Sequence, residues 1–395
     1  MDIVVTASAD PPLAEQSVEV VERKGLGHPD TICDALAEEV SVALCQFYLE
    51  RFGAILHHNV DKVLLVGGQS TPVFGGGEVR EPIEIYLAGR ATAEARGVRV
   101  PVAELAVESC KAWLRAHLRY LDVDEHVRLH TRIRPGSAEL VELFLRQRET
   151  GDWLSNDTSC GAGFAPRTPL ETAVLATEHG LRSEDALRKH PERGEDIKVM
   201  GVRHGERVAL TVSDALVSAH VRSVADYRDQ CAALAADARA LSGAAAVEVN
   251  AGDDLARGAM FLTVTGTSAE AGDDGEAGRG NRPSGLITPY RPMTMESVAG
   301  KNPVSHVGKI YNVAAGRIAE RIVAECDAVR GAECILVSCV GAKVREPQIA
   351  HVRCVLAPGA GVRDVEPRIR NLVGEGLAGL DRIYEDFVAR RAPIA

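Results

Sequence analysis

The stretch ERKGLGHPDTICD at residues 22–34 combines residue types that can hold phosphate and a divalent cation. Two glycines precede His28, and a proline then stands where apolar spacing predicts that an amphipathic helix begins. Glycines let backbone N–H groups approach a ligand closely, and a helix N-terminus favours anions. Asp30 and Asp34 fall four residues apart on one helix face, within reach of a cation bound to phosphate. The alternative is a glycine turn, a proline-started helix and a solvated histidine.

Four further segments place charged side chains beside glycines or before a helix. They are Asp157 in NDTSCGAGFAP (156–166), Asp196 and Lys198 in GEDIKVMG (194–201), Asp273 and Arg279 in GDDGEAGRGNR (272–282), and Lys301 and His306 in SVAGKNPVSHVGK (297–309). Each segment alone is also compatible with a turn or with surface charge. Together they supply cations, carboxylates and exposed backbone, which is the inventory for binding a polyphosphate with magnesium.

Several common catalytic motifs are absent from the sequence. Lys301 is followed by Asn302, so its segment is not a Walker A loop, and no G-x-G-x-x-G closes a strand. No serine or cysteine stands in a G-x-S-x-G nucleophile motif. An enzyme with this inventory takes its nucleophile from a substrate, and the protein contributes positioning and charge stabilisation.

Composition narrows the class of protein. The 395 residues predict two or three domains, and 46% hydrophobic with 26% charged residues is an ordinary globular balance. The net charge of −11 disfavours a general nucleic-acid binder or a protein that lies on anionic membranes. The nine cysteines form no C-x-x-C pair, and no long apolar run or signal segment is present. We expect a cytoplasmic protein with reduced thiols, no membrane and no nucleic acid.

The elements that must position these side chains are short strands alternating irregularly with helices. Strands are expected over 55–58, 63–68, 83–89, 127–133, 208–212, 246–250, 260–267, 334–341 and 351–357. Helices are expected over 102–118, 139–147, 169–180, 222–242, 305–325 and 364–391. Paired strands without strict strand–helix alternation favour α+β domains with antiparallel or mixed sheets. The segment 268–285 is the clearest break, either a flexible linker or a ligand loop.

Eight blocks, in order from about residue 18 to about residue 315, resemble the archaeal-type S-adenosylmethionine synthetases, also called methionine adenosyltransferases. The blocks are ERKGLGHPDTICD, HHN, LLVGGQ, FGGGE, NDTSCGAGFAP, GEDIKVMG, TGTSAEAGDDGEAGRGNR and GKNPVSHVGKIYN. The resemblance implies three similar α+β sandwich domains around a pseudo-threefold axis with an interleaved chain, approximately 1–145, 146–265 and 266–395. It also implies a homodimer or higher homo-oligomer with active sites between subunits.

The resemblance implies a reaction between ATP and L-methionine. The methionine sulfur attacks C5′ of the ribose and expels triphosphate, which the same site hydrolyses to pyrophosphate and phosphate. Mg²⁺, held by Asp30, and K⁺ are the implied cofactors. A highly charged leaving group explains why positive charge would gather around His28.

Individual residues take roles by resemblance. His28, Lys198, Arg279 and Lys301 would act on the triphosphate; Asp157, Asp196, Asp273, Gly136, Ser137, His58 and Asn59 would complete the nucleotide and methionine sites. The sequence departs from the archaeal-type pattern at Cys160, where an aromatic residue is common, at Ala162 and Phe164 nearby, and at Glu139, which replaces an aspartate. Gly280 stands in place of the lysine of a bacterial arginine–lysine pair, as in the archaeal branch.

Three alternatives remain at this point. They are a paralogue that uses a methionine analogue, a nucleotide-binding regulatory subunit of a true synthetase, and an ATP-dependent ligase or kinase. A regulatory subunit is expected to have lost some of the charged set, yet His28, Asp30, Lys198, Arg279 and Lys301 are all present. A ligase or kinase would release ADP or AMP.

Overall fold

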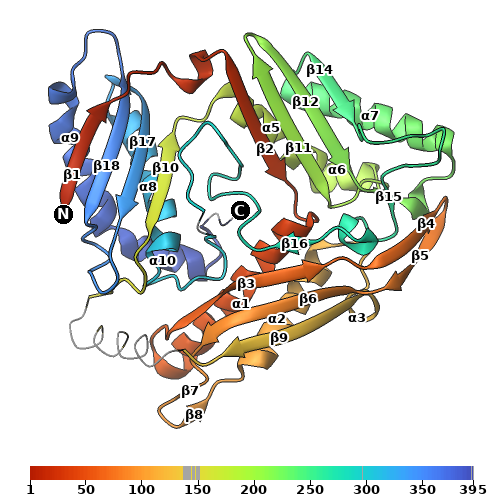
Figure 1. Cartoon of the computed structure of the whole chain (residues 1–395), viewed down its shortest axis with the longest axis horizontal. Coiled ribbons are helices and arrows are strands. Elements are labelled where there is room, and N and C mark those ends of the chain that lie inside the picture. Colours follow the sequence, from red (N-terminus) through yellow and green to blue (C-terminus); the bar gives the residue numbers. More distant parts are fainter. Residues whose placement is uncertain (137–143, 145–146, 148–151, 296, 393, 395) are drawn as a thin grey trace.

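The computed structural model describes the chain from residue 1 to residue 395 except for 137–143, 145–146, 148–151, 296, 393 and 395. Within these residues the chain forms three four-stranded sheets around the centre of the molecule, and the helices lie behind the sheets in the view of Figure 1. Each sheet has its own hydrophobic core against its helices. The α+β fold with several sheets is therefore confirmed. No helix in the described part of the chain is long and apolar enough to cross a membrane.

The first sheet is assembled from both ends of the chain and its middle. In order, its strands are β1 (Asp2–Ala7), β18 (Ile349–Leu356), β17 (Val329–Val337) and β10 (Cys160–Ala165). Its helices are α8 (Val307–Glu325), α9 (Val362–Ala378) and α10 (Leu380–Val388). Because β1 is the first strand and runs parallel to β18, the N-terminus lies beside the C-terminal part of the chain.

The second and third sheets are interleaved in the same way. The second contains β14 (Ala246–Val249), β12 (Arg207–Asp214), β11 (Ile197–His204) and β2 (Val18–Lys24), with α5 (Pro169–Leu181), α6 (Glu184–Lys189) and α7 (Val224–Ser242). The third contains β16 (Gly275–Glu276), β3 (His58–Val66), β6 (Ile83–Ala91) and β9 (Val127–Arg134), with α1 (Pro29–Phe52), α2 (Val102–His117) and α3 (Val123–His126). Three short strand pairs lie outside these sheets: β4 (Gln69–Val73) with β5 (Gly76–Glu81), β7 (Glu94–Ala95) with β8 (Val98–Arg99), and β13 (Leu216–Val217) with β15 (Leu262–Thr263). The 3₁₀ helices are η1 (Leu13–Glu15), η2 (Ser218–His220) and η3 (Ser268–Ala271).

The junction between sheets positions the candidate site. β2 belongs to the second sheet, but the next element, α1, covers the third, so the glycine turn between them crosses from one sheet to the other. Likewise β16 pairs with β3 although it follows the second sheet in the sequence. The ends of β2, β11, α1 and β16 therefore meet.

Several predicted elements are corrected by the structure. The segment 260–267 forms a strand only at Leu262–Thr263, the strand expected over 55–58 begins at His58, and the helix expected over 364–391 is interrupted at Gly379, which ends α9 and starts α10. The linker interpretation of 268–285 is wrong, because the segment contains η3 and β16. The helix expected over 139–147 and Ser137 lie outside the described residues, apart from Phe144 and Gln147.

The strand β10 is not among the strands expected from the sequence, and its glycines have a packing reason. A Cβ on Gly161 would lie 2.2 Å from the backbone of Tyr311, and one on Gly163 would lie 2.1 Å from the backbone of Gly316. Both contacts are to α8, so the two glycines let the helix backbone approach the strand directly. Sequence pattern alone gives this segment the composition of a turn.

Candidate functional site

The glycines before His28 serve close packing and not ligand contact, which corrects the sequence-based expectation. Gly25 and Gly27 donate their N–H groups to the carbonyls of Ile197 and Glu195, at 2.6 and 2.9 Å. A Cβ on Gly27 would lie 2.4 Å from the N atom of Asp196, and one on Gly25 would lie 2.5 Å from the Ile197 side chain. The turn is thus pressed against the start of β11, which brings His28 beside the segment that carries Asp196 and Lys198.

His28 is the N-cap of α1 and has a defined tautomer. Its Nδ1 accepts the backbone N–H of Asp30 at 3.2 Å, so the ring proton of the neutral form is on Nε2. Burial, and then the nearby ammonium of Lys24, lower the pKa of His28 to about 4, with Lys198 acting in the same direction. At neutral pH His28 is an uncharged donor through Nε2–H.

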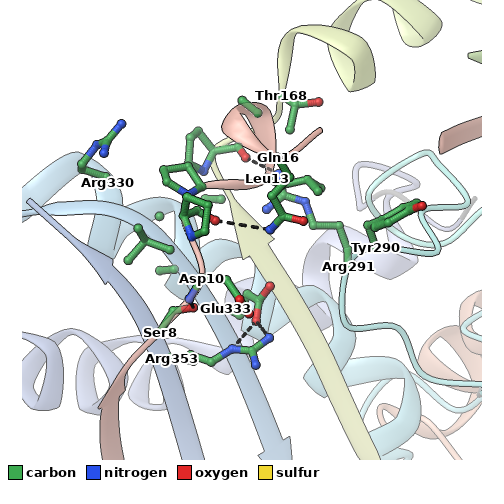
Figure 2. A pocket seen from close by; sticks show the side chains of 18 of the residues that line it. Ser8, Asp10, Leu13, Gln16, Thr168, Tyr290, Arg291, Arg330, Glu333 and Arg353 are labelled. Carbon is green, nitrogen blue, oxygen red and sulfur yellow. Dashed lines mark hydrogen bonds and ion pairs between the residues drawn. The ribbon is translucent and has the colours of Figure 1, made fainter. Parts of the chain in front are cut away.

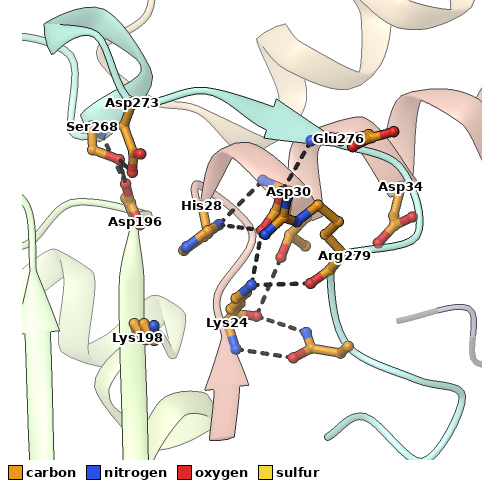
Figure 3. Close-up of polar contacts among 12 residues, drawn as sticks. Lys24, His28, Asp30, Asp34, Asp196, Lys198, Ser268, Asp273, Glu276 and Arg279 are labelled. Atoms are coloured by element: carbon orange, nitrogen blue, oxygen red, sulfur yellow. Dashed lines mark hydrogen bonds and ion pairs between the residues drawn. The ribbon is translucent and has the colours of Figure 1, made fainter. Parts of the chain in front are cut away.

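Asp30 is an ionised carboxylate at the same helix end. Its Oδ2 accepts from the Nζ of Lys24 at 2.8 Å, and its Oδ1 accepts the Glu276 N–H at 2.9 Å. Burial alone raises the pKa of Asp30, but these two hydrogen bonds outweigh it and the pKa lies below its usual value. Figure 3 shows His28, Asp30, Lys24 and the backbone of Arg279 converging at this point.

Two further carboxylates, those of Asp196 and Asp273, lie near each other across the glycine turn (Figure 3). The Oδ2 of Asp196 accepts from the N–H and from the hydroxyl of Ser268, at 2.8 and 2.5 Å. The same hydroxyl lies 3.0 Å from the Oδ2 of Asp273. Full burial raises the pKa of Asp196 to about 7, and the charge of Asp273 acts in the same direction. Ser268 therefore joins the two aspartates that the sequence placed far apart.

Arg279 and Lys301 line one cavity of ≈ 1050 Å³. Its floor includes Cys160 of β10 and residues of β3 and β6. Among the residues that the structure describes, no carboxylate lies within ion-pairing distance of the Arg279 guanidinium. Lys198 is 40% exposed and lies 3.6 Å from Glu22. Arg279 is exposed, so its guanidinium is accessible to an anionic ligand.

Lys301 is held by buried charges. Its Nζ donates to the Oδ2 of Asp61 at 2.5 Å, and its carbonyl accepts from the Nζ of Lys309 at 3.1 Å. Lys309 is fully buried and pairs with Glu38 at 2.5 Å. Burial raises the pKa of Asp61, but Lys301 and Lys62 outweigh it and lower the pKa to about 2.

The remaining predicted residues lie at different distances from this cavity. Asp157 is partly exposed, and its Oδ2 is 3.6 Å from the Nε2 of His306, the N-cap of α8. His58 is fully buried against Ser41 at 2.8 Å, where burial lowers its pKa to about 3. Asn59 forms an isolated bridge with Lys301. Gly136 packs so closely on the buried His57 ring that a Cβ would lie 2.5 Å from it.

A second cavity, of ≈ 220 Å³, contains none of the predicted site residues (Figure 2). It lies between the chain after β1, the start of α5 and the ends of β17 and β18. Three of its arginines pair with carboxylates: Arg353 bonds Glu333, Arg330 bonds Glu15, and Arg291 bonds Glu171 at 2.9 Å; the fourth, Arg167, donates to the carbonyl of Ser284 at 3.1 Å. Of these two cavities, the larger one contains the predicted residues Arg279 and Lys301, and it is therefore the candidate site.

Comparisons with known proteins agree with this geometry. A family model described as S-adenosylmethionine synthetase (AdoMet synthetase) matches residues 1–391. The chain belongs to the S-adenosylmethionine synthetase family.

Relatives in this family cover essentially the whole chain. A probable S-adenosylmethionine synthase of Aquifex aeolicus is 50% identical over 400 residues, covering 100% of both chains. The S-adenosylmethionine synthases of Pyrobaculum neutrophilum and Methanocaldococcus jannaschii are 47% and 42% identical, covering 97% and 98% of both chains respectively. A solved structure of an unusual S-adenosylmethionine synthetase from Campylobacter jejuni aligns with a TM-score of 0.63 at 15% identity over 95% of this chain and 94% of that one, which supports the synthetase fold.

Asp30 fits the role of a magnesium ligand in this family site. It is ionised, and it lies beside the site cations. Within the described residues no three His, Cys, Asp or Glu side chains gather into a metal cage. A cation here would take its other ligands from phosphate oxygens and water, which is the usual mode of Mg²⁺ binding.

Sequence reasoning missed Lys24, Asp61, Ser268 and Lys309 as parts of the site. Lys24 directly precedes the glycine turn, so its position beside a predicted phosphate-binding segment could have indicated that it belongs to the site. Ser268 and Asp61 carry no such signal, because their partners lie 72 and 240 residues away along the chain.

Proposed function

We propose that the chain forms S-adenosylmethionine from ATP and L-methionine, as a methionine adenosyltransferase. The observation that carries the proposal is the convergence of His28, Lys198 and Arg279 from three separate segments on the N-terminus of α1, in a chain of this family. The methionine sulfur attacks C5′ of the ribose, and the C5′–O bond to triphosphate breaks. The triphosphate is then hydrolysed to pyrophosphate and phosphate.

The site residues then have distinct chemical tasks. The neutral His28 donates Nε2–H to an oxygen where the ribose meets the triphosphate, which is where negative charge develops as the C5′–O bond breaks. Arg279 contacts phosphate oxygens with its planar fork, while Lys198 and Lys301 contribute point charges. Mg²⁺ held by Asp30 would shield the charge of the triphosphate when bound. The enzyme supplies no nucleophile, so its contribution is alignment and charge stabilisation.

The carboxylates and the remaining polar residues complete the substrate sites in our proposal. Asp196 and Asp273, linked through Ser268, contact the adenosine and methionine side of the site. Asp157 contributes from the loop before β10, while Gly136 and Ser137 would contact the nucleotide or methionine. His58 and Asn59 support this region from β3, since His58 is buried behind Lys301 through Ser41.

We also propose a homodimer or higher homo-oligomer with active sites at the subunit interface. The support is the uncovered face of the sheets, where large apolar side chains remain exposed on strands of all three. They are Val4 of β1 at 38%, Leu64 and Val66 of β3 at 47% and 39%, and Val202 of β11 at 39%. An exposed apolar face is typical of a protein interface.

K⁺ as a second cation and a cytoplasmic location complete the proposal. The nine cysteines are all free thiols, which suits a reducing compartment. The K⁺ requirement is tested by comparing turnover in potassium salts with turnover in sodium or tetramethylammonium salts at constant ionic strength.

The deciding experiment is incubation of the purified protein with ATP, methionine and Mg²⁺, followed by mass detection of nucleotides and anion chromatography. S-adenosylmethionine, pyrophosphate and phosphate are expected in equal amounts, and none without ATP or Mg²⁺. Stoichiometric ADP or AMP would refute the proposal. A parallel arm with methionine analogues tests whether Cys160, on the cavity floor, widens the choice of sulfur substrate.

A further inference from the structure

We propose that Asp34 is a positioning residue for Arg279: its carboxylate holds the segment 276–282 in the one arrangement that aims the guanidinium into the cavity. The inference rests on the proposed role of Arg279 at the triphosphate. It also gives a reason for glycine at position 280.

Asp34 holds the segment by direct hydrogen bonds. Its Oδ1 accepts the N–H of Gly278 at 2.8 Å and lies 3.4 Å from the hydroxyl of Ser297. One helical turn earlier, Asp30 accepts the N–H of Glu276 at 2.9 Å. Two carboxylates spaced i, i+4 on α1 therefore bind two alternate peptide groups of the segment. This spacing fixes the register of the segment against the helix.

The other side of Arg279 is fixed as well. Asn281 exchanges two hydrogen bonds with the backbone of Lys24, at 3.0 and 2.8 Å, and the Nζ of Lys24 donates to the carbonyl of Arg279 at 3.0 Å. The Nη2 of Arg282 donates to the carbonyl of Gly278 at 2.5 Å. The backbone on both sides of Arg279 is thus held, while its guanidinium has no ion-pair partner among the described residues.

Gly280 is explained by the second oxygen of Asp34. A Cβ built on Gly280 would lie 2.3 Å from Asp34 Oδ2, far inside van der Waals contact. The backbone of Gly280 is outside the left-handed region, so space, and not conformation, requires the glycine. The Asp34 carboxylate occupies the space that a side chain at position 280 would need, so the two residues depend on each other.

Asp34 acts through the segment and not on the substrate. It is buried, with 3% exposure, and it does not line the cavity that contains Arg279. Figure 3 shows Asp34 on α1 behind the loop that carries Arg279, away from His28. Its Oδ1 accepts a peptide N–H and its Oδ2 lies against Gly280, so both oxygens face the loop. For this reason we do not assign Asp34 as a metal ligand.

The test is a double-mutant cycle between Asp34→Ala and Arg279→Leu, with synthesis and hydrolysis of added tripolyphosphate measured separately. Displacing a contact group by about 1 Å costs up to ~10²-fold in rate. Asp34→Ala is therefore expected to lower kcat roughly 10- to 100-fold in the parent. In the Arg279→Leu background it should cost less than about 3-fold, because the residue it positions is already gone.

Two further variants keep the test decisive if Asp34→Ala folds poorly. Asp34→Asn preserves the Oδ1 acceptor and the shape, and should retain at least about a third of the parental kcat. Gly280→Ala should lose activity in the Asp34 parent, but should cost less than about 3-fold when added to Asp34→Ser, in which the obstructing oxygen is absent. Circular dichroism and urea midpoints establish that each compared variant is folded.

Three results would overturn the inference. They are additive losses in the Asp34–Arg279 cycle, a shift of more than about 10-fold in the Mg²⁺ concentration for half activation in Asp34→Asn, and a loss from Gly280→Ala that is as large in the Asp34→Ser background as in the parent. Failure of the parent to make S-adenosylmethionine, or full activity of Arg279→Leu, would instead refute the proposed function, so the two failures are distinguishable.

Discussion

Replacing Lys309 with methionine should destabilise the protein by about 3–5 kcal/mol, the usual cost of breaking a buried ion pair from one side. The Lys309 side chain is 0% exposed, and its Nζ donates to both oxygens of Glu38, at 2.7 and 2.5 Å, and to the carbonyl of Lys301. Methionine fills a similar volume but makes none of these hydrogen bonds. The carboxylate of Glu38, only 9% exposed, would keep a single described partner, the N–H of Gly300 at 3.0 Å.

The assay is urea unfolding of the parent, Lys309→Met, Glu38→Gln and the double variant, followed by far-UV circular dichroism. The double variant should be at least about 2 kcal/mol more stable than Lys309→Met, because it leaves no uncompensated buried charge. Turnover should fall in Lys309→Met, since the carbonyl of Lys301 loses the Lys309 donor and keeps only the more distant Ser41 hydroxyl, at 3.3 Å, among the described donors. A loss below about 1 kcal/mol, or a double variant no more stable than the single one, would refute the reasoning.

Four other predictions concern the site and the assembly. Arg279→Leu should slow tripolyphosphate hydrolysis more than sulfonium formation, so that anion chromatography detects free tripolyphosphate; equal loss of both steps would contradict this. His28→Ala and Asp30→Asn should each lower kcat by ~10²–10³ with an unchanged fold, and a loss of only a few-fold would argue against their roles. The pKa of His28 is lowered to about 4 in the folded protein, so the unfolded chain binds a proton first as the pH falls below 6.5. The free energy of unfolding is therefore highest above pH 6.5 and decreases as the pH falls toward 4. Relative to His28→Asn, the parent should lose about 2 kcal/mol between pH 7 and pH 5, and a constant difference would exclude the shift. Light scattering at micromolar concentration should give at least a dimer, and a fully active monomer would contradict an interfacial site.

The sequence determined the local chemistry of the site and most helices. Helical periodicity located α2, α5, α7 and α8 within a few residues. The first three bury one face and expose the other, whereas 307–315 of α8 are buried all round. Proline after an N-capping His28 marked the start of α1, since both effects act within one turn. The charged motifs were also readable, and their order along the chain was sufficient for the family resemblance.

Only the tertiary structure decided what each glycine and each buried charge is for. Gly25 and Gly27 have the composition of a ligand loop, yet they are required by the strand that lies over them. Domain boundaries stay a prediction, because β1, β2 and β16 each join a sheet formed mainly by distant segments. Composition records that a residue is small or charged, whereas its role depends on which distant segment lies within a few ångströms. That distance is set by the packing of the three sheets, and for this reason the Asp34–Gly280 and Lys309–Glu38 pairs became visible only in the folded chain.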